Sequence, residues 1–379
     1  MSRWRVVILI LILVLISAGF AFGLTGCWDA REIDRRAFIF AMGIDLEANG
    51  LYRVSAIAVR GSSPSAGISA GSGVTGDMAA KVPVLVAQGR TVAEAMDALA
   101  ANSARNIDWG NLRSIILGEM LSQNGVNAVV RTALADPRTP ADVILFQAQG
   151  SAEAIVRSRP EGEEHLQAWL DHYRSKANPE TPAQFFVPAW QFRSHLINPG
   201  QDAFLGTIAL RDQEDPQPTL SGIAVFKDDR LRGFLNEDQT TDFSWMSGKT
   251  GGLVVVGNPH VPDQMIPVRI IALRRDLAIS ASKSTVPVLS IKIRATGAIN
   301  NTGDISELAS LAAARIKKQI ATTALIMQKE FSADLLGFGE LARRSAPYEW
   351  QPDTWENQWN QAAWNVTVEV SLQASGRYQ

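Results

Sequence analysis

A single cysteine, Cys27, is present in this chain of 379 residues. One thiol cannot close a disulfide within the chain, and it cannot supply the several cysteines of a structural zinc site. If Cys27 carries a covalent group, thiol catalysis is excluded as well, because no other thiol remains. We therefore expect packing alone to hold the folded part of the chain together.

Histidine and surplus charge are also scarce. The chain has 4 histidines, and its 36 basic and 38 acidic residues give a formal net charge of −2. His165 and His172 are seven positions apart and could share a helix face, but a metal site needs closer pairs with further ligands. We expect solvated or structural histidines, no metal and no cofactor. The lack of a basic surplus argues against nucleic acid as a partner.

The motifs of the common enzyme classes are absent or misplaced. There is no Gly-x-Ser-x-Gly elbow. Residues 71–76 match the letters of a dinucleotide fingerprint, but they lie in a Gly/Ser/Ala-rich loop at 60–80. Residues 248–250 imitate the end of a phosphate-binding loop, yet Phe243 stands where its first glycine is needed. We predict no catalytic residues, although a pair of glycosidase carboxylates stays open because such groups meet only in the fold.

One long apolar run is present, and it lies at the N-terminus. Arg3 and Arg5 precede residues 6–24, which hold no charged residue and end in small side chains. Residues 24–27 then read Leu-Thr-Gly-Cys, a small-residue cleavage point directly before the cysteine. This sequence resembles the bacterial lipobox, in which the cysteine thiol receives a diacylglyceryl group. We predict a lipoprotein signal peptide over residues 1–26 and lipid attachment at Cys27.

An uncleaved transmembrane anchor is the alternative. Residues 6–24 would span roughly 28 Å as a helix, close to a hydrocarbon core of about 30 Å. The lipoprotein is favoured because the only cysteine stands where a lipobox needs it. Both interpretations place everything after Cys27 outside the cytoplasm, attached to a membrane. The remaining chain is long enough for two or three domains.

The hydrophobic pattern after Cys27 predicts an α+β fold with several domains, three in number, built from mixed and antiparallel sheets with packed helices. Hairpins are expected around residues 48–50 and 228–229, and two long antiparallel strands are expected over 267–298. A long helix should run from 305 to about 330. A second helix, interrupted near Gly337, should run over 333–344. Thr91 and Glu94 form a candidate capping box. The predicted boundaries are an N-terminal α/β domain at 27–160, a helix and connector at 161–205, a small middle domain at 206–262 and a C-terminal α+β domain at 263–379.

Four tryptophans are concentrated near the C-terminus: Trp350, Trp355, Trp359 and Trp364. An exposed row of tryptophans could stack on sugars or bind a protein partner. Buried, they are large core side chains in a domain without disulfides, and this interpretation is favoured. Interface energy is usually concentrated in a few Trp, Tyr and Arg residues. Any exposed members of the set Arg343, Arg344, Trp350 and Trp355 are therefore our candidates for binding a partner.

Three collinear motifs resemble the Ger(x)C family of spore germination proteins, the lipoprotein C subunits of germinant receptors. The first comprises residues 26–33, which continue the lipobox, together with Gly43-Ile44-Asp45. The second is residues 221–235, and the third is residues 334–340 followed by Trp350 and Trp359. They run in order from Cys27 almost to the C-terminus.

The resemblance implies a three-domain α+β ectodomain without known catalysis, acting with integral membrane A and B subunits at the spore inner membrane. The predicted function is thus a non-enzymatic, lipidated receptor subunit needed for nutrient-triggered germination. An extracytoplasmic solute-binding lipoprotein is the alternative, and it requires two similar lobes around a cleft. A wall-acting enzyme is a third class.

Overall fold

The computed structural model describes residues 4, 11–13, 35–60, 82–175, 186–212, 214–249, 251–261, 263–280, 286–300 and 305–374. Cys27 and nearly all of the predicted signal peptide lie outside these residues, as do residues 61–80 of the predicted loop. Within the described ranges, no helix combines the length and the apolar character needed to cross a membrane.

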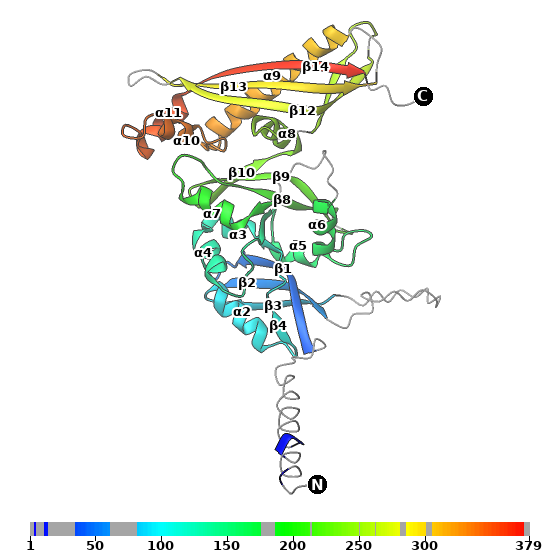
Figure 1. Ribbon diagram of the computed structural model, residues 1–379, viewed down its shortest axis with the longest axis vertical. Coiled ribbons are helices and arrows are strands. Elements are labelled where there is room, and N and C mark those ends of the chain that lie inside the picture. The colour runs from blue at the N-terminus through cyan, green and yellow to red at the C-terminus, as the bar shows by residue number, and fades with distance from the viewer. Residues whose placement is uncertain are drawn as a thin grey trace, which may run out of the picture.

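Ten strands of the described chain form one sheet (Figure 1). They are β1 (Arg36–Leu46), β2 (Tyr52–Arg60), β3 (Val84–Gly89), β4 (Asn106–Asp108), β5 (Ser114–Leu117), β6 (Ile144–Ala148), β7 (Val187–Pro188), β8 (Phe204–Arg211), β9 (Gln217–Lys227) and β10 (Arg230–Leu235). The order is β10-β9-β8-β6-β5-β1-β2-β3, with β4 added beside β1 and β7 beside β6. The central strands β1, β5, β6 and β8 run parallel, and antiparallel hairpins flank them on both sides.

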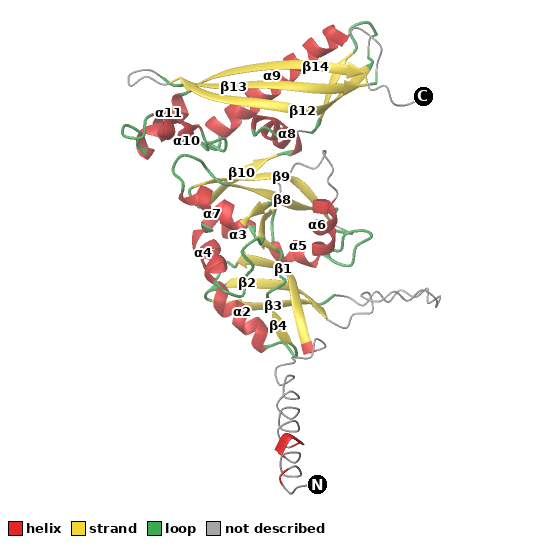
Figure 2. Cartoon of the chain, viewed as in Figure 1, coloured by secondary structure: helices red, strands yellow, loops and turns green. Residues whose placement is uncertain are grey.

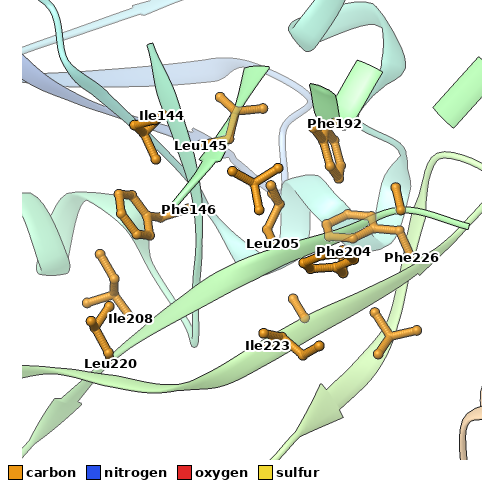
Figure 3. Close-up of a cluster of buried hydrophobic side chains, with 14 of the residues drawn as sticks. Ile144, Leu145, Phe146, Phe192, Phe204, Leu205, Ile208, Leu220, Ile223 and Phe226 are labelled. Atoms are coloured by element: carbon orange, nitrogen blue, oxygen red, sulfur yellow. The ribbon is translucent and has the colours of Figure 1, made fainter. Parts of the chain in front are cut away.

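Helices cover both faces of this sheet: α2 (Val92–Ala101), α3 (Glu119–Asn124), α4 (Asn127–Ala135), α5 (Ala152–Arg157), α6 (Leu166–Ser175) and α7 (Ala189–Ile197). In Figure 1, α5 and α6 lie on one side and α2, α4 and α7 on the other. Every residue of β5 and β6 is buried, as expected for central parallel strands, and their sequences are apolar except for Ser114 and Gln147. Figure 3 shows aromatic rings filling the adjoining core, where Phe192 and Phe226 meet edge to face at 5.1 Å between centroids.

The second sheet has the order β11-β12-β13-β14, and Figure 2 shows α9 lying against it. Its strands are β11 (Leu253–Gly257), β12 (Met265–Ser280), β13 (Val288–Ile299) and β14 (Ala363–Ala374). Its helices are α8 (Glu237–Met246), α9 (Ile305–Lys329), α10 (Phe338–Ser345) and α11 (Pro352–Gln361). The chain leaves β13, passes through α9, and returns as β14 parallel to β13.

The predicted α+β fold is confirmed, and so are both hairpins, the two long strands and the long helix. The predicted stripe of α9 is buried at Leu308, Ala312, Ile316, Ile320 and Met327. These elements have strong local periods or turn signals, which explains why the sequence alone predicts them.

Two local predictions were wrong, and two helices were missed. Thr91 caps α2 by accepting from the Glu94 N–H, but the Glu94 carboxylate accepts from the backbone N–H of Arg90 instead of Thr91. The helix predicted from residue 333 begins at Phe338. Helices α3 and α11 were not predicted.

The predicted divisions near residues 160 and 206 cut through one sheet, because β6 and β8 on either side of them are paired. Membership of one sheet does not test whether these segments fold independently, so the domain boundaries stay a prediction. The two sheets differ in size and strand order, so the described chain is not built from two similar lobes.

Candidate functional site

Asp334 opens the third sequence motif, and its buried carboxylate organises the start of α10. One oxygen accepts from the backbone N–H groups of Gly337 at 2.9 Å and Phe338 at 3.1 Å, and the other from Gly339 at 2.7 Å. A helix leaves these first N–H groups without partners, and Gly337 at the N-cap has no side chain to satisfy them. Gly337 has φ 76°, a left-handed conformation that favours glycine.

Opposing effects set the pKa of Asp334. Burial is the largest and raises the pKa to about 7, while the N–H donors lower it and the carboxylate of Asp202 raises it. The residue is 3% exposed, so water cannot replace the three donors.

Asp202 joins the loop before β8 to this motif. Its N–H donates to the carbonyl oxygen of Asp334 at 2.9 Å, and its carboxylate accepts from the N–H of Asp334 at 2.7 Å. Lys227, at the end of β9, places its Nζ 3.3 Å from the same carboxylate oxygen. Burial raises the pKa of Asp202, and Lys227 opposes that shift. The ten-stranded sheet and the C-terminal segment are thereby linked through a charge-compensated contact.

Glycines allow the two segments to approach backbone to backbone. The N–H of Glu340 donates to the carbonyl of Gly200 at 2.8 Å. A Cβ at Gly200 would lie 2.6 Å from the Glu340 nitrogen, and one at Gly339 would lie 2.4 Å from Trp355 Nε1. A larger residue at either position would push the segments apart.

The other two motifs use aspartate in the same way. Asp45 accepts from the N–H groups of Ala152 and Glu153, both at 2.8 Å, at the start of α5. At the start of α4, the backbone carbonyl of Asp229 accepts from the N–H of Val126 at 2.8 Å, and the carboxylate of Asp229 accepts from the N–H of Asn127 at 3.4 Å. Each motif therefore fixes the first turn of a helix, the first two motifs from a distant part of the chain and the third across a short turn.

The C-terminal tryptophans are mainly core residues, as the sequence interpretation favoured. Trp359 is 2% exposed, and its ring meets that of the half-buried Trp364 edge to face with 5.6 Å between centroids. Phe338 is fully buried, and its ring centroid also lies 5.6 Å from that of Trp364. Gln328 of α9 ties this cluster together, because its Nε2 donates to the carbonyls of Trp359 at 2.6 Å and Ala362 at 2.9 Å.

The four candidate partner-binding residues are divided by burial. Arg343 and Arg344 have side chains that are 49% and 75% exposed, and both pair with Glu340 at 2.8 Å. Trp350 is half-buried. Trp355 is only 4% exposed and packs against Trp359, so it does not meet the condition of exposure that was set for the candidates. Its position on α11, which was not predicted, turns it inward.

Glu340 and Tyr348 belong to the same surface and were not singled out from the sequence. The two arginines, Arg343 first, lower the pKa of Glu340 to about 2, so the carboxylate stays ionised. Tyr348 is 100% exposed. We call Glu340, Arg343, Arg344, Tyr348 and Trp350 the α10 surface. The feature of the sequence that could have indicated this surface is a run of large polar and aromatic residues that does not follow the apolar period of a buried helix.

The other candidate chemistry of the sequence stays dispersed. Among the described residues, no three His, Cys, Asp or Glu side chains gather as a metal site would require. His172 pairs with Glu163, and His260 lies 3.3 Å from Glu307. Residues 71–76 and the lipid attachment residue Cys27 lie outside the described residues.

Two family models match the chain. The spore germination protein N-terminal domain matches residues 29–210, and the spore germination B3/GerAC-like C-terminal domain matches residues 221–376. Together they include nearly all of the described fold.

Similar proteins of bacilli match over most of their own length. YfkR of Bacillus subtilis (strain 168), which is named for spore germination, is 25% identical over 85% of each chain. Spore germination protein GerQC of Bacillus cereus is 21% identical over 99% of each. Spore germination protein KC of B. subtilis is 22% identical over 89% of this chain and 88% of its own.

The crystal structure of the GerBC protein superposes with a TM-score of 0.57, covering 87% of this chain and 96% of that one at 15% identity. At that identity the likeness concerns the fold. Since the two matched domains account for most of the sequence, the chain belongs to the Ger(x)C family of spore germination proteins.

Proposed function

We propose that this chain is the lipid-anchored C subunit of a membrane germinant receptor and acts by assembling with integral membrane A and B subunits. The observation that carries the proposal is the match of both germination domains, over residues 29–210 and 221–376. Relatives named as germination proteins that align over nearly their whole length support the same assignment.

The predicted anchor gives this subunit a fixed place. Strand β1 begins at Arg36, nine residues after Cys27. A fully extended segment of that length reaches at most about 30 Å. A lipid on Cys27 would therefore hold the start of β1 within about that distance of the outer face of the membrane, which in this proposal is the spore inner membrane.

Protein contact, without catalysis, is the proposed mode of action. In the described parts of the family motifs, the carboxylates of Asp45 and Asp334 accept from N–H groups at helix starts, which is a structural role. The α10 surface offers arginine, tyrosine and tryptophan, the residue types in which interface energy concentrates. We propose this surface, through Arg343, Arg344 and Trp350, as a contact with the membrane subunits.

Complementation tests the proposal. In a strain with no other member of the family, deletion of the gene should abolish germination in nutrients without reducing the number of heat-resistant spores, and the wild-type chain should restore it. Cys27→Ala should give a folded chain that carries no palmitate label and restores germination poorly. Unchanged nutrient germination after the deletion would overturn the proposal.

A further inference from the structure

A cavity of about 260 Å³ lies where α7, α8, β12 and the loop before α10 meet. Its walls come from segments that belong to different germination domains, since residues 186–204 fall within the N-terminal match and residues 243–336 within the C-terminal one. A molecule bound there would touch both domains.

The charged groups of the cavity are all basic. Lys249 and Arg275 line it together with His195, and no aspartate or glutamate is among its lining residues. The side chain of Arg275 is half-buried and makes no hydrogen bond or ion pair with another residue of the described chain. Burial lowers its pKa, and the charge of Asp276 opposes that shift without forming an ion pair. A guanidinium withdrawn from water without a counter-ion is costly, and an anion would compensate it.

The nearest acid along the strand does not supply that counter-ion. Asp276 follows Arg275 on β12, and successive strand residues point to opposite faces of the sheet. Asp276 is exposed and pairs with Arg294 on the outer face. The side chain of Arg275 lies instead near Gly248, with its Nε 3.4 Å from where a Cβ would be.

His195 adds an imidazole ring. Its Nδ1 is sealed from solvent and has no hydrogen-bond partner in the described structure, so a ligand in the cavity would meet the other ring nitrogen, Nε2. Burial lowers its pKa, so the imidazole is neutral at neutral pH and can donate one N–H to an anion. The remaining wall includes Phe204, Phe243 and Leu335, which are apolar.

We propose that this cavity binds a small organic carboxylate. The carboxylate would lie between Arg275, Lys249 and His195. A planar guanidinium suits a carboxylate because two parallel N–H donors match its two oxygens. The proposal is independent of assembly with other subunits.

Isothermal titration calorimetry of the full chain in a nonionic detergent tests this site, with benzoate as the probe. Benzoate should bind saturably, and benzamide, which has the same shape without the charge, should not. Arg275→Gln should weaken benzoate binding by roughly tenfold or more. The control is Arg274→Gln, whose exposed side chain lies on the opposite face of β12 and whose loss should leave binding unchanged. Lys249→Gln provides a second, exposed variant should Arg275→Gln fail to fold.

Imidazole NMR signals provide an independent readout, since the chain has only 4 histidines. With a tag other than polyhistidine, His195→Asn identifies the signal of His195. Benzoate should shift that signal and leave the other three in place. The proposal is overturned if the wild-type chain shows no saturable benzoate binding, if benzamide binds as well as benzoate, or if Arg274→Gln and Arg275→Gln weaken binding equally.

Discussion

Asp202 and Asp334 hold each other through reciprocal hydrogen bonds although they are 132 residues apart. The N–H of Asp334 reaches the Asp202 carboxylate at 2.7 Å, and the N–H of Asp202 reaches the Asp334 carbonyl at 2.9 Å. The contact joins the ten-stranded sheet to the segment that leads into α10.

Replacing Asp334 by alanine should destabilise the chain. The change leaves three buried N–H groups without an acceptor, and the expected loss is about 2–5 kcal/mol in the free energy of unfolding. Tryptophan fluorescence during urea unfolding would measure it, since the tryptophan cluster adjoins α10. The control is Asp142→Ala, an exposed aspartate whose removal should change little. Equal midpoints for the two variants would contradict the capping role of Asp334.

Asp242 predicts a specific dependence of stability on pH. Burial raises its pKa to about 6, against an ordinary value of 3.8, while a hydrogen bond from Thr323 opposes the shift. The folded state therefore holds this proton more tightly than the unfolded state, so its contribution to stability is present below the ordinary pKa and is lost as pH rises through about 6.

Asp242→Asn cannot ionise and should escape that loss. Relative to the wild-type chain, the variant should gain melting temperature between about pH 4 and about pH 7.5. Calorimetry at several pH values isolates the effect, since other titrating groups cancel in the difference. A difference that stays constant with pH would show that Asp242 is ionised throughout.

Phe338 should behave as a core residue. It is fully buried against Trp364, and Phe338→Ala should cost about 3–5 kcal/mol of stability. Tyr348→Ala removes a ring of similar size that is 100% exposed, and should change stability by no more than about 0.5 kcal/mol. Comparable losses for both variants would mean that the aromatic cluster is not the core of this region.

The arginines of the α10 surface should affect assembly more than stability. Exposed ion pairs contribute little to stability because solvent screens them, so the double variant Arg343→Ala/Arg344→Ala should melt close to the wild-type chain. It should nevertheless recover less of the membrane subunits in pull-downs from spore membranes. Lys317→Ala/Lys318→Ala removes two adjacent exposed cations from α9 and should recover them normally. Equal recovery by the two double variants would remove the α10 surface from the proposed interface.

Elements with local signals could be predicted from the sequence. The hairpin at Asp228 and Asp229 has turn residues between alternating strands, and Asp228 adopts φ 56°. The stripe of α9 follows the helical period. The single ten-stranded sheet could not be predicted, because the pairing of β6 with β8 joins segments on either side of the predicted boundaries.

The candidate surface was predicted only in part, because the burial of a side chain also depends on contacts between segments that are distant in sequence. Arg343 and Arg344 carry charge that favours exposure wherever the helix lies. Trp355 has no such preference, and its burial depends on where α11 places it. The structural roles of Asp45, Asp229 and Asp334 were also hidden, since each satisfies N–H groups far away in sequence or across a turn.

The most direct test of the proposed subunit role is to purify the tagged wild-type chain from spore membranes and identify its companions by mass spectrometry. The result we predict is recovery of two integral membrane proteins together with this chain, whose N-terminal peptide begins at a lipid-modified Cys27. A lipidated, folded chain that is recovered alone after crosslinking would contradict the assignment as a receptor subunit.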